Sequence, residues 1–208
     1  LRTALTIGLG SPEEMAVAAN RAGSAKIFKL KLGNVEPVAC VHSVREERPD
    51  VELIVDVNGG WSAGELAEYA PALAKLGVSL IEQPLKRGQD EGIAGCMSTV
   101  PIAADETCLN LAELQQLIGY DVVNIKLDKC GGLTEALQMV ALAKKTGRSV
   151  MVGNMAGSSL AMAPAFVIGL SSTHVDLDGP WLLETDVANG MHIAADGLVE
   201  PPTSRLWG

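Results

Sequence analysis

Three short apolar segments of this 208-residue chain each end on an acidic residue. One of them runs into Glu82, and Pro84, two residues later, prevents further regular strand pairing. Two others run into Asp56 and Asp105. An apolar run that stops on a carboxylate is typical of a buried parallel strand whose carboxyl end carries a functional group. The repetition of this pattern indicates one site built from several strand ends.

Strand-like and helix-like segments alternate along the chain, as expected for parallel strands joined by helical crossovers. The clearest helix start is Ser11, which is followed by Pro12 and two acids. The predicted strands cover residues 3–7, 27–33, 51–55, 79–82, 102–104, 122–127, 149–152 and 174–177. The predicted helices cover residues 12–22, 37–47, 62–76, 92–99, 111–118, 134–145 and 158–168.

Polar residues stand at most of the predicted strand ends, 21 to 28 residues apart. Eight strand–helix units of this length close into a TIM-type barrel. A doubly wound open sheet also alternates, but it does not require a reactive group at nearly every strand end, and no glycine-rich nucleotide loop follows the first strand. We therefore predict an α/β fold, a modified (β/α)8 barrel of parallel strands in which residues 1–208 form a single domain with a C-terminal tail. The strand-end residues are Lys31, Asp56, Glu82, Asp105, Lys126, Asn154 and Asp176.

The composition fits one large core and argues against several classes of partner. Hydrophobic residues make up 48% of the chain and the formal net charge is −9, so we expect neither nucleic acid nor an anionic membrane surface as a partner. The longest apolar region, residues 160–170, is too short to cross a membrane. The four cysteines lie far apart without a CxxC pair, which predicts reduced thiols in a cytoplasmic protein.

Three oxygen ligands on consecutive strand ends predict a site for one divalent cation. Mg²⁺ is the best match for Asp56, Glu82 and Asp105. Lysines flank this set in the order of the ring, with Lys31 on the second strand and Lys126 on the sixth. The second and sixth positions of an eight-stranded ring face each other, so we expect one amine on each face of a molecule bound to the metal.

A lysine is a poor base at neutral pH because its pKa lies near about 10.4 in water, but nearby positive charge lowers that pKa. Lys29, two residues before Lys31, and the metal would supply such charge. Two lysines that flank a metal-held carboxylate are suited to removing and returning the proton on the adjacent carbon. The metal would stabilise the enediolate formed between these two steps.

The motifs around these residues are Lys29-Leu30-Lys31, Asp56, Ile81-Glu82-Gln83-Pro84, Ala104-Asp105-Glu106, and Lys126 with Gly131-Gly132. Together they resemble the enolase superfamily, specifically its muconate-lactonising subgroup, from about residue 3 to the C-terminus. The resemblance implies a set of Mg²⁺ ligands, an acid–base pair and supporting residues, among them a lysine that tunes the neighbouring base. The implied metal ligands are Asp56, Glu82 and Asp105, the acid–base pair is Lys31 and Lys126, and the supporting residues are Lys29, Asn58 and Glu106.

The last predicted strand and the residue directly after it carry two acids, Asp176 and Asp178, on one face. No metal role requires them, and their simplest ligand is a cation such as a primary ammonium. The pair resembles the Asp-x-Asp signature of dipeptide epimerases, and residues 151–155 and 158–161 resemble epimerases acting on L-Ala-D/L-Glu. The resemblance implies Mg²⁺-dependent epimerisation of the C-terminal residue of a dipeptide, with Asp176, Asp178 and Asn154 as substrate-binding residues.

Several alternatives stay open. Asp176 and Asp178 also fit a turn before a Gly-Pro pair, and N-acylamino acid racemases and cycloisomerases of the same superfamily need no acidic pair. Members of the superfamily carry an α+β capping domain before the barrel, and we expect that domain to be missing from this chain. The chain is then an isomerase that works with a separate capping domain, or an inactive barrel fragment. The oligomeric state is open, with a homo-oligomer as one expectation.

Overall fold

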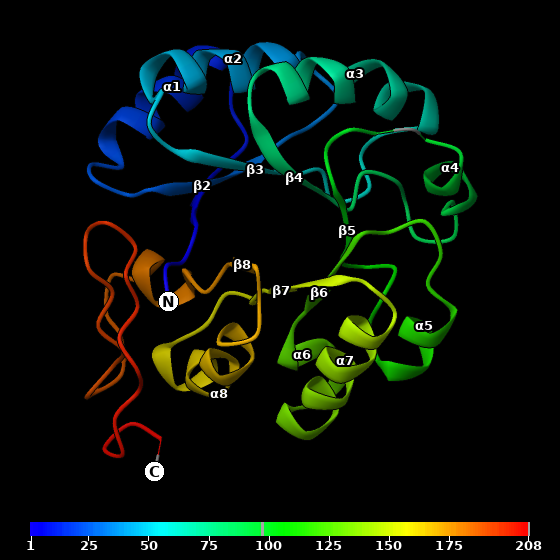
Figure 1. Ribbon diagram of the computed structural model, residues 1–208. Coiled ribbons are helices and arrows are strands. Elements are labelled where there is room, and N and C mark those ends of the chain that lie inside the picture. Colours follow the sequence, from blue (N-terminus) through cyan, green and yellow to red (C-terminus); the bar gives the residue numbers. More distant parts are fainter. Residues whose placement is uncertain (97, 208) are drawn as a thin grey trace.

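The computed structural model describes residues 1–96 and 98–207. Eight strands form one parallel sheet in which each strand pairs with the next along the chain, so the order in the sheet is the order in the sequence (Figure 1). The strands are β1 (Leu5–Ile7), β2 (Ile27–Lys31), β3 (Glu52–Asp56), β4 (Val78–Glu82), β5 (Ile102–Ala104), β6 (Val122–Ile125), β7 (Ser149–Val152) and β8 (His174–Val175).

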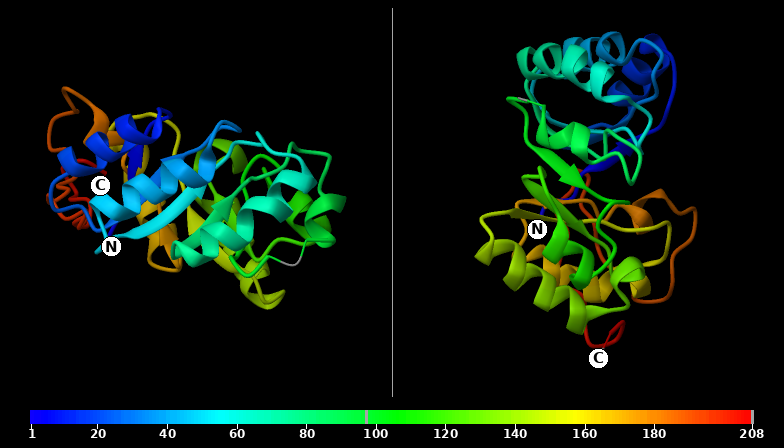
Figure 2. Two further views of the ribbon diagram at one scale, coloured as in Figure 1. Left: turned by 90° about the horizontal axis from the view of Figure 1, so that it is seen from above. Right: turned by 90° about the vertical axis from the view of Figure 1, so that its right-hand side faces the viewer.

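The sheet curls until β8 lies beside β1 (Figure 1), and individual hydrogen bonds join the segments at these two edges. Ala4 donates its backbone N–H to the carbonyl oxygen of Val175 at 2.8 Å. Thr6 donates its N–H to Oδ2 of Asp178, also at 2.8 Å. Two further views show the helices on the outside of the curved sheet (Figure 2). The prediction of a (β/α)8-type barrel of parallel strands is confirmed.

Two of the long helices begin with the same local arrangement. α1 starts after Ser11 and α3 after Ser62, and in both cases the serine and the glutamate three residues later form a capping box. This arrangement satisfies backbone N–H groups that have no partner within the first helical turn. The helices are α1 (Pro12–Arg21), α2 (Pro37–Glu47), α3 (Ala63–Lys75), α4 (Glu91–Ala94), α5 (Leu111–Gln116), α6 (Leu127–Cys130), α7 (Leu133–Lys145) and α8 (Ser159–Gly169), with one 3-10 turn, η1 (Gly179–Leu182).

The structure differs from the predicted elements mainly at their ends. β6 stops before Lys126, because the chain turns there into the four-residue helix α6. The helix predicted for residues 92–99 is wrong beyond Ala94, where α4 ends, and Met97 lies outside the described residues. The sequence predicts neither α6 nor η1, because a helix of four residues is too short to show a hydrophobic period.

Alternate positions of a strand contribute to two different layers of the protein. On β2, Phe28 and Leu30 belong to the large core between the sheet and the helices, whereas Lys29 bonds to acids inside the barrel. A smaller apolar layer fills the interior. Its members on β3, β4 and β5 precede Asp56, Glu82 and Asp105 by two residues each. The layer therefore lies next to the acids, on the side of the amino ends of the strands. The layer consists of Ala4, Ile54, Leu80, Ala103, Val122 and Met151.

The segment after η1 has no further helix or regular strand among the described residues and runs back along the start of the chain (Figure 1). Val199 donates its N–H to the carbonyl oxygen of Leu1 at 2.8 Å, and Thr3 donates its N–H to that of Gly197 at 2.9 Å. None of the helices described is both long and apolar enough to span a membrane.

We expect Leu80→Ala to lower the free energy of unfolding by about 2–5 kcal/mol, because Leu80 is completely buried and its truncation opens a cavity beneath the acids. Urea unfolding followed by circular dichroism measures the change. Leu137→Ala on α7, where Leu137 is 47% exposed, is the matched control and should stay within about 0.5 kcal/mol of the parent. Equal effects of the two substitutions would contradict the interior position of Leu80.

Candidate functional site

The carboxyl ends of the strands open into one cavity of about 540 Å³. Nine of the eleven residues that the sequence predicts for the site line this cavity. The other two, Asp56 and Glu82, are buried and are joined to the cavity through Lys29, which lines it. The nine lining residues are Lys29, Lys31, Asn58, Asp105, Glu106, Lys126, Asn154, Asp176 and Asp178.

Lys29 is the centre of the charged groups at the strand ends. Its Nζ lies 2.6 Å from Oδ2 of Asp176, 3.0 Å from Oδ2 of Asp56 and 3.0 Å from Oε2 of Glu82. Burial alone would lower the pKa of Lys29, but the three carboxylates outweigh it and raise the pKa well above its usual value. Lys29 is therefore a permanent cation that joins the ends of β2, β3 and β4 to the segment after β8.

The two acids after β8 each have a partner within the protein. Asp176 uses Oδ2 to bind Lys29, and Asp178 uses Oδ2 to accept the N–H of Thr6. Oδ1 of Asp176 is buried and has no hydrogen-bond partner among the described residues. The pKa of Asp178 is raised, mainly by burial and to a lesser extent by the negative charge of Asp176. The pair thus keeps an unsatisfied acceptor at the edge of the cavity, where a ligand donor could bind.

Asn154 holds the backbone between these acids and η1. Its Nδ2 donates to the carbonyl oxygen of Asp176 at 2.6 Å, and its Oδ1 accepts the N–H of Gly179 at 3.0 Å. The amide therefore fixes the turn that carries Asp176 and Asp178, in addition to lining the cavity.

Lys31 lies on the β3 side of the cavity. Its Nζ is 2.7 Å from Oδ2 of Asp56 and 2.8 Å from Oδ1 of Asn58, and its side chain is 31% exposed. Asn58 in turn donates from Nδ2 to Oε1 of Glu106 at 3.0 Å. Hydrogen bonds therefore connect Lys31 at the end of β2, through Asn58 after β3, to Glu106 after β5. The ammonium group of Lys31 remains reachable from the cavity.

Lys126 lies on the β5 side, directly after β6. Its Nζ is 2.6 Å from Oδ2 of Asp105, and its side chain is 8% exposed. Burial would lower the pKa of Lys126, but Asp105 and Glu82 outweigh it and raise the pKa. β2 and β6 are separated by three strands in either direction round the barrel, so Lys31 and Lys126 enter the site from opposite sectors of the ring.

Lys129 is a site residue that the sequence reasoning misses. Its Nζ lies 2.6 Å from Oδ1 of Asp105 and donates to the carbonyl oxygens of Asp105, Asn124 and Cys108. A signal for it exists, because Lys129 follows Lys126 by three residues and a helical turn brings such residues to one face. The prediction of a strand over residues 122–127 hid that signal.

The three acids proposed as metal ligands have different proton affinities. Lys29 and Lys31 outweigh burial and lower the pKa of Asp56, and Lys129 and Lys126 do the same for Asp105. Glu82 is completely buried, and burial raises its pKa to about 8 despite the neighbouring Lys29. Of the three acids, Glu82 therefore loses its proton least readily when no further cation is present.

The residues present fit a divalent cation by their chemistry. Asp56, Glu82 and Asp105 offer the carboxylate oxygens that Mg²⁺ prefers, and an added cation would favour the ionised form of the buried Glu82. Among the described residues, no three His, Cys, Asp or Glu side chains are gathered into a ready metal cluster. Lysine ammonium groups hold these carboxylates instead, with Lys29 bound to both Asp56 and Glu82.

The family model described as "Enolase C-terminal domain-like" matches residues 13–205. The chain belongs to this family. The predicted relationship to the enolase superfamily is thereby confirmed.

Curated relatives of this chain include racemases and epimerases. The N-acetyl-D-glutamate racemase of a Pseudoalteromonas species is 41% identical over 204 residues, which cover 98% of this chain and 64% of the relative. The L-Ala-D/L-Glu epimerase of Escherichia coli K12 is 42% identical over 200 residues, which cover 94% of this chain and 62% of the relative. The chain thus spans less than two thirds of the length of these relatives.

Two solved structures, a dipeptide epimerase and a protein with homology to dipeptide epimerases, are also similar to this chain. An enolase family member from Agrobacterium tumefaciens with homology to dipeptide epimerases, solved with sodium and L-Ala-L-Glu, is 41% identical and superposes with a TM-score of 0.96 over 100% of this chain and 64% of that one. A dipeptide epimerase from Enterococcus faecalis V583, solved with Mg and L-Leu-L-Tyr, is 31% identical, with a TM-score of 0.91 over 97% of this chain and 61% of that one.

We expect the protein in a metal chelator to lose stability as the pH rises from about 5 to 8, and Glu82→Gln to reduce that loss. The pKa of Glu82 in the folded protein, about 8, lies above its usual value of 4.5. Between these values the folded protein holds a proton that the unfolded chain has released, so rising pH favours unfolding. Glutamine imitates the protonated acid and cannot ionise.

Urea unfolding at several pH values in this range measures the effect. The difference in free energy of unfolding between Glu82→Gln and the parent should shift in favour of the variant as the pH rises. Parallel pH curves for the two proteins would contradict the raised pKa of Glu82.

Proposed function

We propose that this barrel carries an isomerase site, a racemase or epimerase that moves a proton on the carbon next to a carboxylate. The observation that carries this proposal is the pair of lysines, Lys31 and Lys126, which enter one cavity from opposite sectors of the ring. A carbon between two amines can lose its proton to one and gain a proton from the other, which inverts its configuration. The names of the relatives support the same reaction class.

Asp56, Glu82 and Asp105 would hold Mg²⁺ in this proposal. Bound there, the metal would withdraw charge from the substrate carboxylate and so acidify the adjacent carbon. The Mg present in the dipeptide epimerase from E. faecalis supports the choice of ion. Asn58 and Glu106 would orient Lys31 through their hydrogen bonds.

Lys31 and Lys126 would act as the two acid–base groups, and Lys29 as a fixed cation. Lys31 is the more exposed of the pair, whereas Lys126 is held by Asp105. Both amines must lose a proton to act as a base, and positive charge nearby favours that loss. Lys29 acts in this direction on Lys126, where Asp105 and Glu82 outweigh it and raise the pKa.

The substrate that we propose is a dipeptide, with L-Ala-D/L-Glu as the first candidate. The unsatisfied Oδ1 of Asp176 and the neighbouring carboxylate of Asp178 would bind the α-ammonium group of the first residue. Relatives solved with L-Ala-L-Glu and with L-Leu-L-Tyr support this class.

An N-acylated amino acid is a second candidate. Oδ2 of Asp176 already binds Lys29, and Asp178 already accepts a backbone N–H, so each acid has a partner within the protein that requires no ligand cation. The N-acetyl-D-glutamate racemase among the relatives supports this candidate.

A covering segment over the cavity also belongs to the proposal. Large apolar side chains are exposed in the loops after β1, β2 and β7 and in η1, which surround the strand ends. A capping domain packed on them would exclude water from the site and help to choose the substrate side chain. These side chains, with their exposed fractions, are Leu9 (71%), Val35 (74%), Met155 (47%) and Leu182 (58%).

We expect the protein with Mg²⁺ in D₂O to exchange the glutamyl α-proton of L-Ala-L-Glu and L-Ala-D-Glu, as followed by proton NMR. Lys31→Ala and Lys126→Ala should each lower the interconversion of the two by at least about 100-fold, since each removes one acid–base group. Lys144→Ala, at an exposed position of α7, is the control and should leave the rate unchanged.

If exchange occurs only after a capping-domain polypeptide is added, the site is an isomerase that requires that domain. A total lack of exchange, with or without the polypeptide and for both dipeptides and N-acetylglutamate, would contradict the proposed reaction.

We expect Asp178→Asn to raise the KM for L-Ala-L-Glu at least about tenfold and to change that for N-acetyl-glutamate by less than about twofold, because only the dipeptide carries an ammonium group. Asparagine keeps an oxygen acceptor for the N–H of Thr6, so the fold should persist. Steady-state kinetics with both substrates provides the measurement. An equal loss for both would contradict the ammonium role of the acidic pair.

A further inference from the structure

Gln83 stands in an unusual conformation directly after the buried acid Glu82. Its φ is +38°, in the left-handed region that non-glycine residues rarely adopt, and its side chain is completely buried. A conformation of this kind costs free energy and persists only where surrounding contacts enforce it. The contacts of the Gln83 side chain therefore help to hold the residue in this conformation.

The Gln83 amide uses both of its ends. Oε1 accepts the backbone N–H of Asp105 at 2.9 Å and that of Thr107 at 3.0 Å. Nε2 donates to the carbonyl oxygen of Leu85 at 2.7 Å and to Oγ1 of Thr107 at 2.9 Å. A carboxamide is the one uncharged side-chain group that can accept and donate in this way at once.

These contacts continue the sheet where its backbone pairing ends. The ladder between β4 and β5 has only two registered pairs, Ile81 with Ile102 and Glu82 with Ala103. The N–H of Gln83 makes the last backbone bond, to the carbonyl oxygen of Ala103 at 2.8 Å. Beyond that point, the Gln83 side chain joins the two strand ends that carry Glu82 and Asp105.

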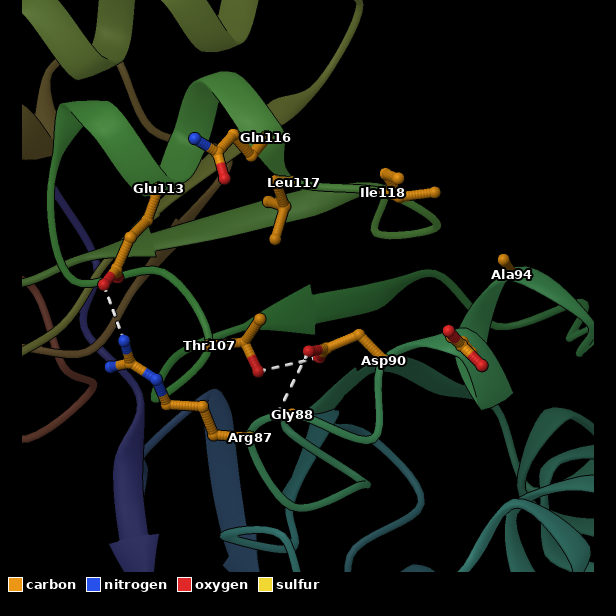
Figure 3. Close-up of a pocket in the computed structure, with 10 residues that line it drawn as sticks. Arg87, Gly88, Asp90, Ala94, Thr107, Glu113, Gln116, Leu117 and Ile118 are labelled. Atoms are coloured by element: carbon orange, nitrogen blue, oxygen red, sulfur yellow. Dashed lines mark hydrogen bonds and ion pairs between the residues drawn. The ribbon is translucent and has the colours of Figure 1, made fainter.

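A second set of bonds holds the outer side of this link. Thr107 donates from Oγ1 to Oδ1 of Asp90 at 2.8 Å, and Tyr120 donates its hydroxyl to the same oxygen at 2.7 Å. The N–H of Gly88 donates to Oδ2 of Asp90 at 3.2 Å. Thr107 and Asp90 face each other at the wall of a separate cavity of about 510 Å³ next to α4 and α5 (Figure 3). Because its proton goes to Asp90, the Thr107 hydroxyl faces Gln83 as an acceptor, which fixes the orientation of the amide.

We propose that Gln83 is a positioning residue that sets the backbone at Asp105 relative to Glu82, and with it the spacing of two of the proposed metal ligands. This inference rests on the proposed metal site for its functional consequence, but the link itself is independent of any metal. Gln83 touches neither substrate nor metal in this proposal and acts through the backbone of Asp105.

Amide hydrogen exchange measured by NMR tests the link directly in the metal-free protein. In Gln83→Leu, exchange at the N–H groups of Asp105 and Thr107 should rise at least about tenfold, because both lose their acceptor. The N–H of Gln83 itself should keep its protection, since its partner Ala103 is unchanged. Gln83→Glu keeps an acceptor oxygen and, in the protonated form that burial favours, one donor, so protection at Asp105 and Thr107 should fall less than in Gln83→Leu.

Two further variants complete the design. Gln116→Leu makes the same chemical change at an exposed residue of α5 and should leave all these amides unaffected. Thr107→Val removes the hydroxyl that accepts from Gln83 and donates to Asp90, and leaves Oε1 of Gln83 and both backbone N–H groups in place. It should raise exchange at Asp105 about two- to fivefold, which keeps the test available if Gln83→Leu does not fold. Unchanged exchange at Asp105, or an equal rise at all amides of β4 and β5, would overturn the proposal.

Titration with MnCl₂ alone, followed by electron paramagnetic resonance of the free ion, tests the consequence for the metal site. Gln83→Leu should weaken Mn²⁺ binding about tenfold, with Gln116→Leu close to the parent. If the parent binds no Mn²⁺, the proposed metal site fails, whereas the exchange data still decide the role of Gln83. If Gln83→Leu loses protection at Asp105 and Thr107 but binds Mn²⁺ as tightly as the parent, the proposed effect of Gln83 on the metal site is wrong.

Discussion

The carboxylates at the strand ends are tolerated inside this barrel because buried ammonium groups lie beside them. Lys29 holds Asp56, Glu82 and Asp176 together, and Lys126 and Lys129 hold Asp105 from two sides. An isolated charge in such a place would be strongly unfavourable, whereas a paired and hydrogen-bonded one is stable. This network joins the ends of β2, β3 and β4 to the segment after β8, and the end of β5 to the segment after β6, so the arrangement of the site and the positions of these strand ends depend on the same ion pairs.

The sequence predicts the architecture well because the fold and the site share one pattern. An apolar strand that ends on a polar residue is repeated at regular spacing, and that repetition determines both the barrel and the edge at which the functional groups meet. The two-residue period also predicts that Lys29 and Lys31 share a face, and the structure turns Lys29 inward, opposite to Phe28 and Leu30. Such features depend on local order and are visible in a single sequence.

The residues that the sequence does not reveal are those whose role depends on contacts between distant segments. Lys129 reads as one more surface lysine until α6 turns it toward Asp105. Gln83 reads as a linker between an acid and a proline, and only the nearness of the β5 end gives its amide partners. The pairing of Asp176 with Lys29 joins residues 147 positions apart, which no periodicity can predict.

The bond from the N–H of Thr6 to Asp178 has an evolutionary consequence. Where β1 meets β8, a side chain stands in for part of the regular ladder, and this side chain also borders the cavity. Mutations at position 178 that would broaden the range of molecules accepted must therefore retain an oxygen acceptor, or the barrel loosens at its seam. Divergence toward new specificities should proceed more freely through the loops around the mouth than through this position.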